Sequence, residues 1–143
     1  MQLMRQATLV MLPLVMGTGV AMAGETQIVL QWLDTREGGM NLREIYGIED
    51  ALEAASGGQY FVDGHDAGSG TVNVFLYAED SMVDLAIATI VCFFEQGKLP
   101  KGMRIGRAIY EDEKRKNWHF QPVYPPGLAE FDIMYSPRTA PGK

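Results

Sequence analysis

Residue types that could do chemistry lie closest together in the segment 63–70. Asp63, His65 and Asp66 place two carboxylates and an imidazole within one short stretch, and Ser69 follows between two glycines. Such a set is compatible with metal binding, general base catalysis, an anion cradle or recognition of a macromolecule. It is also compatible with a hairpin connection, in which the glycines adopt positive φ and the aspartates bond to nearby backbone.

Each chemical interpretation lacks part of its usual pattern. A metal site would use Asp63, His65 and Asp66, with His119 as a distant fourth ligand, but the Cys and His spacing of a zinc site is missing. A calcium loop needs Glu at its twelfth position, where this chain has an apolar residue. Ser69 lacks the Gly-x-Ser-x-Gly pattern of a hydrolase, and the segment leads into a strand and not into a phosphate-binding helix N-terminus. The sequence therefore favours the hairpin connection and indicates no cofactor.

A second set of candidate residues lies on a strand expected over 71–77. Its two faces carry Val72, Val74 and Leu76 on one side and Asn73, Phe75 and Tyr77 on the other. If the valines face the core, Phe75 and Tyr77 point away from it, together with Tyr110 from a later strand. Exposed aromatic side chains in a row need a cover or a partner. The cover could be the C-terminal segment with Trp118, Phe120 and Tyr124, a second copy of the chain, or a ligand or another protein.

Hydrophobic periodicity predicts the elements that must position these residues. Strands are expected over 27–33, 59–62, 71–77 and 103–111, with helices over about 42–56 and 81–96. Asn41 is the expected N-cap of the first helix, with Glu44 as its capping-box partner, and Ser81 is that of the second. The order β-α-β-β-α-β predicts an α+β, ferredoxin-like fold, with a four-stranded antiparallel sheet, two helices on one face and a C-terminal extension. Pro122 restricts 118–124 to an edge strand or an irregular segment.

The second predicted helix is apolar on nearly every side. It is expected to be the central buried helix of the domain, because it is too short to span a bilayer. Cys92, the single cysteine, lies within it and is expected to be a buried small hydrophobe. An intrachain disulfide is impossible with one thiol, and an intermolecular disulfide or a nucleophile is the alternative interpretation.

Residues 1–23 have the pattern of a secretory signal peptide. Arg5 precedes an apolar run that ends in the small-x-small sequence Ala21-Met22-Ala23, which predicts Gly24 as the mature N-terminus. The expected organisation is a signal peptide over 1–23, the α+β domain over 24–112, an extension packing on it over 113–135, and a disordered tail over 136–143. A retained membrane anchor is the alternative interpretation of residues 1–23. The predicted location after export is the bacterial periplasm, or the outside of the cell.

Charge limits the class of partner. Cleavage after Ala23 would leave 11 Lys and Arg against 18 Asp and Glu, a formal charge of −7. Such a chain is not expected to bind nucleic acid, nor a membrane once the signal is removed, because both select basic surfaces. The charge is compatible with solubility alone, and equally with a basic protein partner. The sequence thus predicts a non-catalytic exported interaction module, for example an immunity-type inhibitor, with a homodimer through the open sheet face as a further possibility. The alternative is a small metal- or ligand-binding protein or enzyme that uses the segment 63–70.

Overall fold

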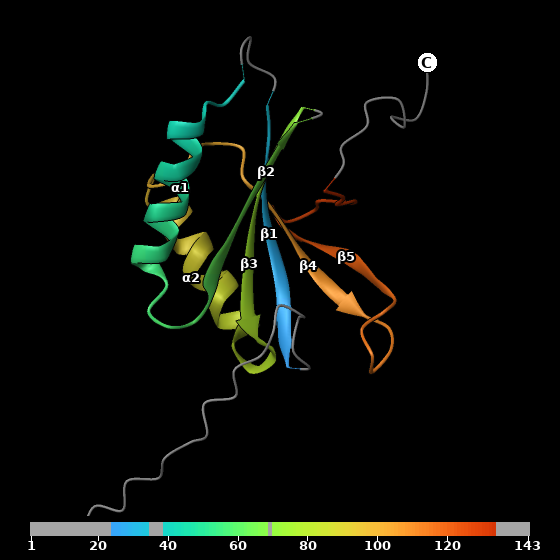
Figure 1. The fold of residues 1–143 in the computed structure, drawn as a ribbon. Helices are drawn as coiled ribbons and strands as arrows, with labels where there is room; N and C mark the ends of the chain where they lie inside the picture. Colours follow the sequence, from blue (N-terminus) through green and yellow to red (C-terminus); the bar gives the residue numbers. More distant parts are fainter. Residues whose placement is uncertain (1–23, 35–38, 69, 134–143) are drawn as a thin grey trace, which may run out of the picture.

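A computed structural model describes residues 24–34, 39–68 and 70–133, and these form an α+β domain (Figure 1). An open antiparallel sheet of five strands carries both helices on one face. The predicted signal peptide over 1–23, the predicted tail over 136–143 and the candidate residue Ser69 lie outside the described residues. None of the helices that the structure describes is long and apolar enough to cross a membrane.

The elements follow the predicted order, with one strand more. They are β1 (Glu25–Leu33), α1 (Leu42–Ala55), β2 (Phe61–Gly68), β3 (Thr71–Glu79), the short 3₁₀ helix η1 (Asp80–Met82), α2 (Val83–Glu95), β4 (Arg104–Tyr110) and β5 (Trp118–Tyr124). Across the sheet the strand order is β2-β3-β1-β4-β5, and every neighbouring pair is antiparallel.

The expectation of a four-stranded sheet is wrong by one strand, because residues 118–124 join the sheet as β5. Pro122 lies opposite Gly106 of β4, next to a register shift between Ile105 and Gly106. β5 lies at one edge of the described sheet, so it pairs with a neighbouring strand on one side only. Proline, which lacks a backbone N–H, is tolerated at such a position.

The core lies between the sheet and the helices, and alternation along the strands decides which residues enter it. The buried cluster includes Ile28, Leu30 and Trp32 of β1, Val74 and Leu76 of β3, and Ile48, Leu52, Val83, Ile87 and Ile90 of the helices. Burying one such side chain contributes about 1.5–3 kcal/mol. The predicted faces of 71–77 are therefore confirmed, and Phe75 and Tyr77 belong to the side turned away from the helices, which we call the open face.

The start of α1 is as predicted, but the start of α2 is not. Asn41 accepts a hydrogen bond from the backbone N–H of Glu44 at 2.9 Å and so caps α1. Ser81 is not the cap of α2, because it lies within η1 and no side chain caps the helix that follows.

The prediction that α2 is a central buried helix is also wrong, and so is the prediction for Cys92. The helix packs on the sheet with one side and leaves its outer side uncovered, where Leu85 is 51 % exposed and Cys92 is exposed. A helix that covers one face of a single sheet has an outer side with no second layer to pack against it.

The segment predicted as a loop over 63–70 is mostly strand. β2 extends from Phe61 to Gly68, with a bulge between Val62 and Gly64 that leaves Asp63 without a partner in the ladder. Gly64 and Gly68 have φ of +136° and +155°, which glycine adopts without steric cost. The hairpin therefore turns only at its end, and its glycines belong to an irregular edge strand.

The C-terminal segment after β5 turns back over the open face. Gly106 has no side chain, and a Cβ there would lie 2.3 Å from the ring of Phe131, so the ring is seated directly on β4. Gln31 donates to the backbone oxygen of Asp132 at 2.7 Å, and Asn73 donates to that of Ile133 at 2.9 Å. One half of the open face is thus covered by residues 131–133 of the chain itself. Trp118, Phe120 and Tyr124, the residues expected to be the cover, are instead part of β5.

Candidate functional site

The structure does not bring Asp63, His65 and Asp66 together. Val62 packs against the core and His65 contacts α1, whereas Asp66 pairs with Asn73 on the open face. Asp63 occupies the bulge and is exposed. Successive residues of a strand point to opposite sides of the sheet, so the two carboxylates and the imidazole cannot act on one substrate atom.

The candidate metal ligands are separated further by the strand order. His65 lies on β2 and His119 on β5, the two opposite edges of the sheet. His119 bonds to Glu111 at 3.0 Å, and both side chains are more than half exposed. Among residues 24–34, 39–68 and 70–133, no group of three His, Cys, Asp or Glu side chains could hold a metal ion.

His65 has a structural role that its sequence neighbours do not indicate. Its Nδ1 is bonded to Oε1 of Glu49 on α1, and the two side chains are only 21 % and 18 % exposed. The ring of Tyr46 meets the imidazole edge-on, at 5.6 Å between centroids. This contact ties the edge strand β2 to α1.

The uncovered half of the open face carries a different constellation, with one residue from each strand; Phe61, Tyr77 and Gln27 are register partners, as are Tyr110 and Trp118, and a hydrogen bond from Gln27 to Tyr110 joins the two sets. This cross-sheet row consists of Phe61, Tyr77, Gln27, Tyr110 and Trp118, in the order β2, β3, β1, β4, β5. Strand spacing of about 4.8 Å makes the row about 19 Å long. Its two ends are the most open part, because Phe61 is 48 % and Trp118 is 46 % exposed.

Hydrogen bonds and ring stacking hold the middle of the row in place. The ring of Tyr77 stacks on that of Phe61, with centroids 5.5 Å apart and an angle of 18° between the planes. Gln27 donates from its side chain to the Tyr77 hydroxyl at 3.2 Å and from its backbone N–H to the Tyr110 hydroxyl at 3.3 Å. The aromatic side chains therefore form an ordered surface and are fixed by polar contacts as well as by packing.

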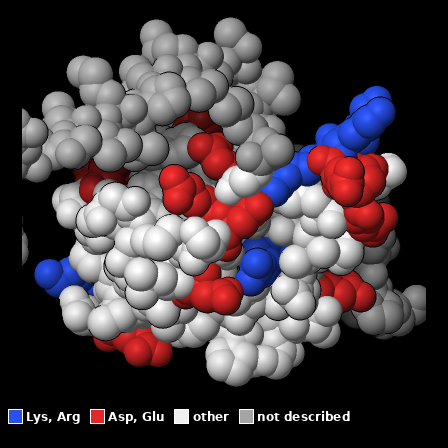
Figure 2. Space-filling view, turned by 90° about the horizontal axis from the view of Figure 1, so that it is seen from below, with Lys and Arg blue, Asp and Glu red and all other residues white. Residues whose placement is uncertain are grey.

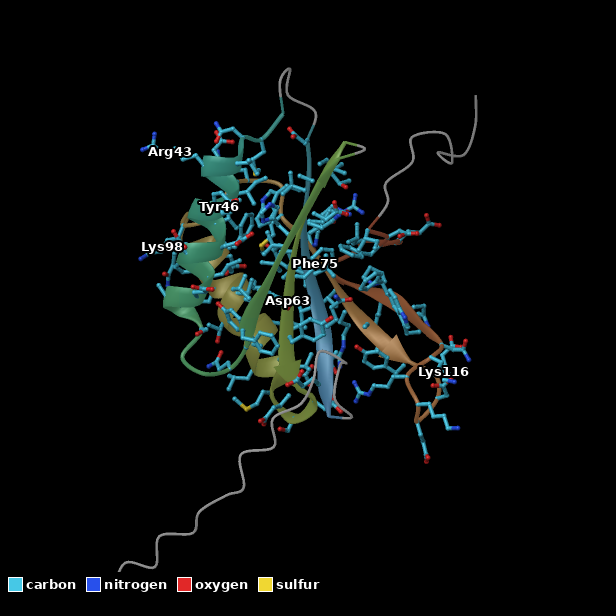
Figure 3. The ribbon with its side chains drawn as sticks, viewed as in Figure 1. Arg43, Tyr46, Asp63, Phe75, Lys98 and Lys116 are labelled. Carbon is cyan, nitrogen blue, oxygen red and sulfur yellow. The ribbon has the colours of Figure 1, made fainter. Side chains whose placement is uncertain are left out.

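The surroundings of Tyr77 are acidic. Burial raises the pKa of its hydroxyl, and the nearby Asp63, Tyr110 and Glu25 raise this pKa further, whereas the hydrogen bond from Gln27 lowers it. The two carboxylates that raise this pKa thus come from the neighbouring strands, Asp63 from β2 and Glu25 from β1. Figure 3 shows Asp63 below Phe75 on the side of β2, toward the same end of the sheet as the row.

A cation of the chain itself already occupies one part of this surface. The guanidinium carbon of Arg115 lies 4.2 Å from the centroid of the Tyr110 ring. Its Nη2 donates to Oδ2 of Asp80 at 2.7 Å, and its Nη1 donates to the backbone oxygen of Glu25. Arg115 has φ of +54°, a left-handed conformation that costs a non-glycine residue about 1–2 kcal/mol. The turn after β4 thus adopts an unfavourable backbone conformation where it directs a guanidinium onto an aromatic ring.

Acidic side chains gather at the end of the molecule beside the row (Figure 2). This acidic end contains Glu25, Glu79, Asp80, Asp84, Glu111, Asp112 and Glu113, from the start of β1, the end of β3, the start of the helical region and the β4–β5 hairpin. A hollow of about 590 Å³ opens there, lined by Thr26, Asp80, Arg107 and the hairpin. Arg107 is paired with Asp84 at 3.0 Å, and Arg115 with Asp80.

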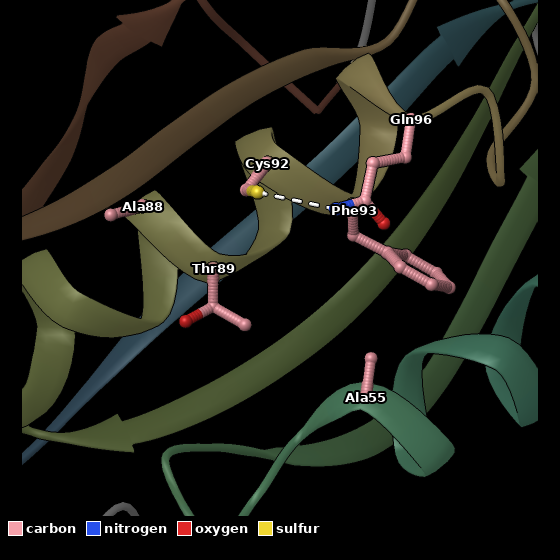
Figure 4. Close-up of a pocket in the computed structure, with 6 residues that line it drawn as sticks. All are labelled: Ala55, Ala88, Thr89, Cys92, Phe93 and Gln96. Carbon is pink, nitrogen blue, oxygen red and sulfur yellow. Dashed lines mark hydrogen bonds between the residues drawn. The ribbon is translucent and has the colours of Figure 1, made fainter.

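A second hollow, of about 410 Å³, lies between α1 and α2 (Figure 4). Ala55 of α1 and Ala88, Thr89, Cys92, Phe93 and Gln96 of α2 and its end line it. The Gln96 side chain donates to Sγ of Cys92 at 3.6 Å. Among the described residues, no charged side chain lines this hollow and no base adjoins the thiol, so they supply no group of the kind that activates a nucleophilic cysteine.

Sequence reasoning found Asp63, Tyr77 and Tyr110, named Trp118 as part of an expected cover of this face, and placed Phe75 correctly on the same face. It missed Phe61, Gln27 and Arg115. Alternation extended backwards from Asp63 would have placed Phe61 on the open face, since both lie on the same short strand. The position of Arg115 had no such signal, because the charged run 111–116 has the composition of an ordinary solvated turn.

Comparison with known proteins adds no further constraint on the site. No protein-family model, no curated protein and no solved structure matches this chain.

Proposed function

We propose that this protein is a non-catalytic exported interaction module that binds a basic protein partner through the cross-sheet row and the adjoining acidic end. The contact of Arg115 with Tyr110 and Asp80 carries the proposal. This contact shows that an aromatic ring and a carboxylate of this surface together hold a guanidinium group. Both interactions are favourable for cations, and a partner with lysine or arginine side chains would meet more of the same groups.

Charge favours a basic partner over a second copy of the chain. The precursor has a formal charge of −6, and the predicted mature chain one of −7. A homodimer through the open face would bring two such rows and their acidic neighbours together, which repulsion opposes. A basic partner is attracted instead, and such attraction speeds association. An immunity-type inhibitor of a basic toxin is one protein of this description.

Export is part of the proposal and is supported by the sequence of residues 1–23. β1 begins at Glu25, two residues after the predicted cleavage point, so cleavage there would remove no residue of the sheet. The fold class also belongs here in its finer form. The order β2-β3-β1-β4 with both helices on one face is what a ferredoxin-like domain would have, and β5 would then be an added edge strand.

The proposal is tested with a lysine- and arginine-rich peptide as the probe, whose affinity for the purified chain 24–143 is measured by calorimetry at two salt concentrations. We expect binding that weakens as salt rises, and a loss of about five-fold or more when Trp118 and Phe61 are both changed to Ala. Tyr46→Ala is the matched control, since Tyr46 is 52 % exposed on α1, on the helix side of the sheet. Equal loss in the control, or no binding by the unchanged protein, would contradict the proposal.

A further inference from the structure

The cross-sheet row has two aromatic positions next to carboxylates, and only one of them holds a cation in the structure. At Tyr110 the three components are a ring, the Asp80 carboxylate and the backbone oxygen of Glu25, and Arg115 contacts all three. Two strands away, the Tyr77 ring has Phe61 stacked on it, with Asp63 two residues beyond Phe61 on β2 and Glu25 two residues before Gln27, the partner of Tyr77 on β1. The two positions therefore offer the same chemistry.

No cation is seen at the second position. Within the part of the chain that the structure describes, neither the Asp63 side chain nor that of Glu25 takes part in an ion pair. The described arginines are engaged elsewhere or lie apart: Arg107 pairs with Asp84, Arg104 lies over Phe131, and Arg43 is on α1 (Figure 3). None of these described arginines lies at the second position, which is therefore open to a cation from a partner.

We propose that the Phe61–Tyr77 stack, together with Asp63 and Glu25, binds an arginine side chain of the partner, in the way that Tyr110 and Asp80 bind Arg115. This rests on the proposed function and makes it more specific. The two carboxylates come from β1 and β2, on either side of β3, which carries Tyr77. An arginine side chain that lies over the Tyr77 ring can therefore reach a carboxylate at the edge of that ring.

The geometry selects a guanidinium over an ammonium group. The planes of the Phe61 and Tyr77 rings are nearly parallel, at 18°, and the stack offers an aromatic surface at its half-exposed Phe61 end. A planar guanidinium can stack on such a surface while its N–H groups in the plane donate to a carboxylate. An ammonium group is compact and strongly hydrated, so it gains less from the same surface.

The test uses two fluorescent peptides of equal length and charge. Arginine is the only kind of basic residue in one, and lysine is the only kind in the other. Their affinities are measured by fluorescence anisotropy. We expect the arginine peptide to bind about five-fold more tightly to the chain 24–143. Phe61→Leu keeps an apolar side chain and removes the aromatic surface, so it is expected to abolish this preference. Phe61 is half exposed, so the variant is expected to fold, which circular dichroism would verify.

A matched pair of variants tests the carboxylate. Asp63→Asn is expected to weaken the arginine peptide about three-fold, whereas Asp66→Asn is expected to leave it unchanged. Asp66 lies on the same strand and is also exposed, but it pairs with Asn73 at the covered half of the open face.

The outcomes separate this inference from the proposed function. If both peptides bind equally and Phe61→Leu affects them alike, the arginine position is refuted while the basic partner stands. If Asp66→Asn weakens binding as much as Asp63→Asn, attraction is general and the position is again refuted. If neither peptide binds, the inference and the proposed function both fail.

Discussion

Replacing Phe131 with Ala should reveal how strongly the C-terminal segment is held on the open face. Phe131 is 7 % exposed although it lies close to the end of the described chain. Its ring is seated on Gly106 and meets the ring of Phe120 nearly edge-on, at 5.5 Å. The substitution removes both contacts, together with that of Arg104 over the ring, and leaves the backbone bonds of residues 132 and 133 in place.

The magnitude follows from these two contacts. Burial of a phenylalanine side chain is worth about 1.5–3 kcal/mol, and an aromatic pair adds about 0.5–1.5 kcal/mol. We therefore expect Phe131→Ala to lower the free energy of unfolding by about 2–4 kcal/mol. For a domain of this size, that corresponds to a fall in melting temperature of about 6–20 °C. Phe131→Leu, which keeps most of the apolar area, should lose about half as much.

Thermal unfolding followed by circular dichroism, together with urea denaturation, measures the effect. Trp118→Ala is the control, because Trp118 is a larger aromatic residue on the same face but is 46 % exposed. It should cost about 1 kcal/mol or less. A melting temperature of Phe131→Ala within about 2 °C of the unchanged protein, or a smaller fall than that of Trp118→Ala, would refute the seating of the ring on β4.

Three further predictions concern the helices and the core. Gly47→Ala should raise the free energy of unfolding by about 0.5–1 kcal/mol in urea denaturation, because a Cβ there meets nothing within 4 Å and alanine favours the helix; a loss of stability would contradict the open surroundings of α1. Burial raises the pKa of Tyr60 to about 12. Above pH 10 the unfolded state therefore releases the hydroxyl proton while the folded state keeps it, and stability should fall by about 2 kcal/mol as the pH rises from 10 to 12. Tyr60→Phe should remove this fall and cost about 1 kcal/mol at neutral pH through the lost bond to the Leu52 backbone oxygen, and an unchanged fall would assign it to other groups. His65→Ala should lower stability by about 1–2 kcal/mol at neutral pH because it leaves the partly buried Glu49 without its partner, and Glu49→Gln with His65→Gln should recover part of this in the same assay. No recovery would show that packing, and not the pairing, is what His65 provides.

The sequence alone was sufficient for features that depend on neighbouring residues. Alternation over 71–77 assigned Val74 and Leu76 to the core and Tyr77 to the other face, because side chains of a strand alternate with a period of two. Asn41 marked the start of α1, because the cap bonds to an N–H only three residues away. Pro122 limited 118–124 to an edge strand or an irregular segment, because proline cannot complete a ladder on both sides, but it did not decide between the two.

The tertiary structure decided which of those faces and ends come together. The cross-sheet row takes one residue from each of five strands, so it depends on the strand order and on the register of four pairings. The contact of His65 with Glu49 joins residues 16 apart, and Arg115 reaches the start of β1, 90 residues away. Local periodicity carries no information on such distances. The two carboxylates and the imidazole of segment 63–70 look like a site in the sequence, yet the pleat of β2 separates them, and Asp63 alone lies near the aromatic surface.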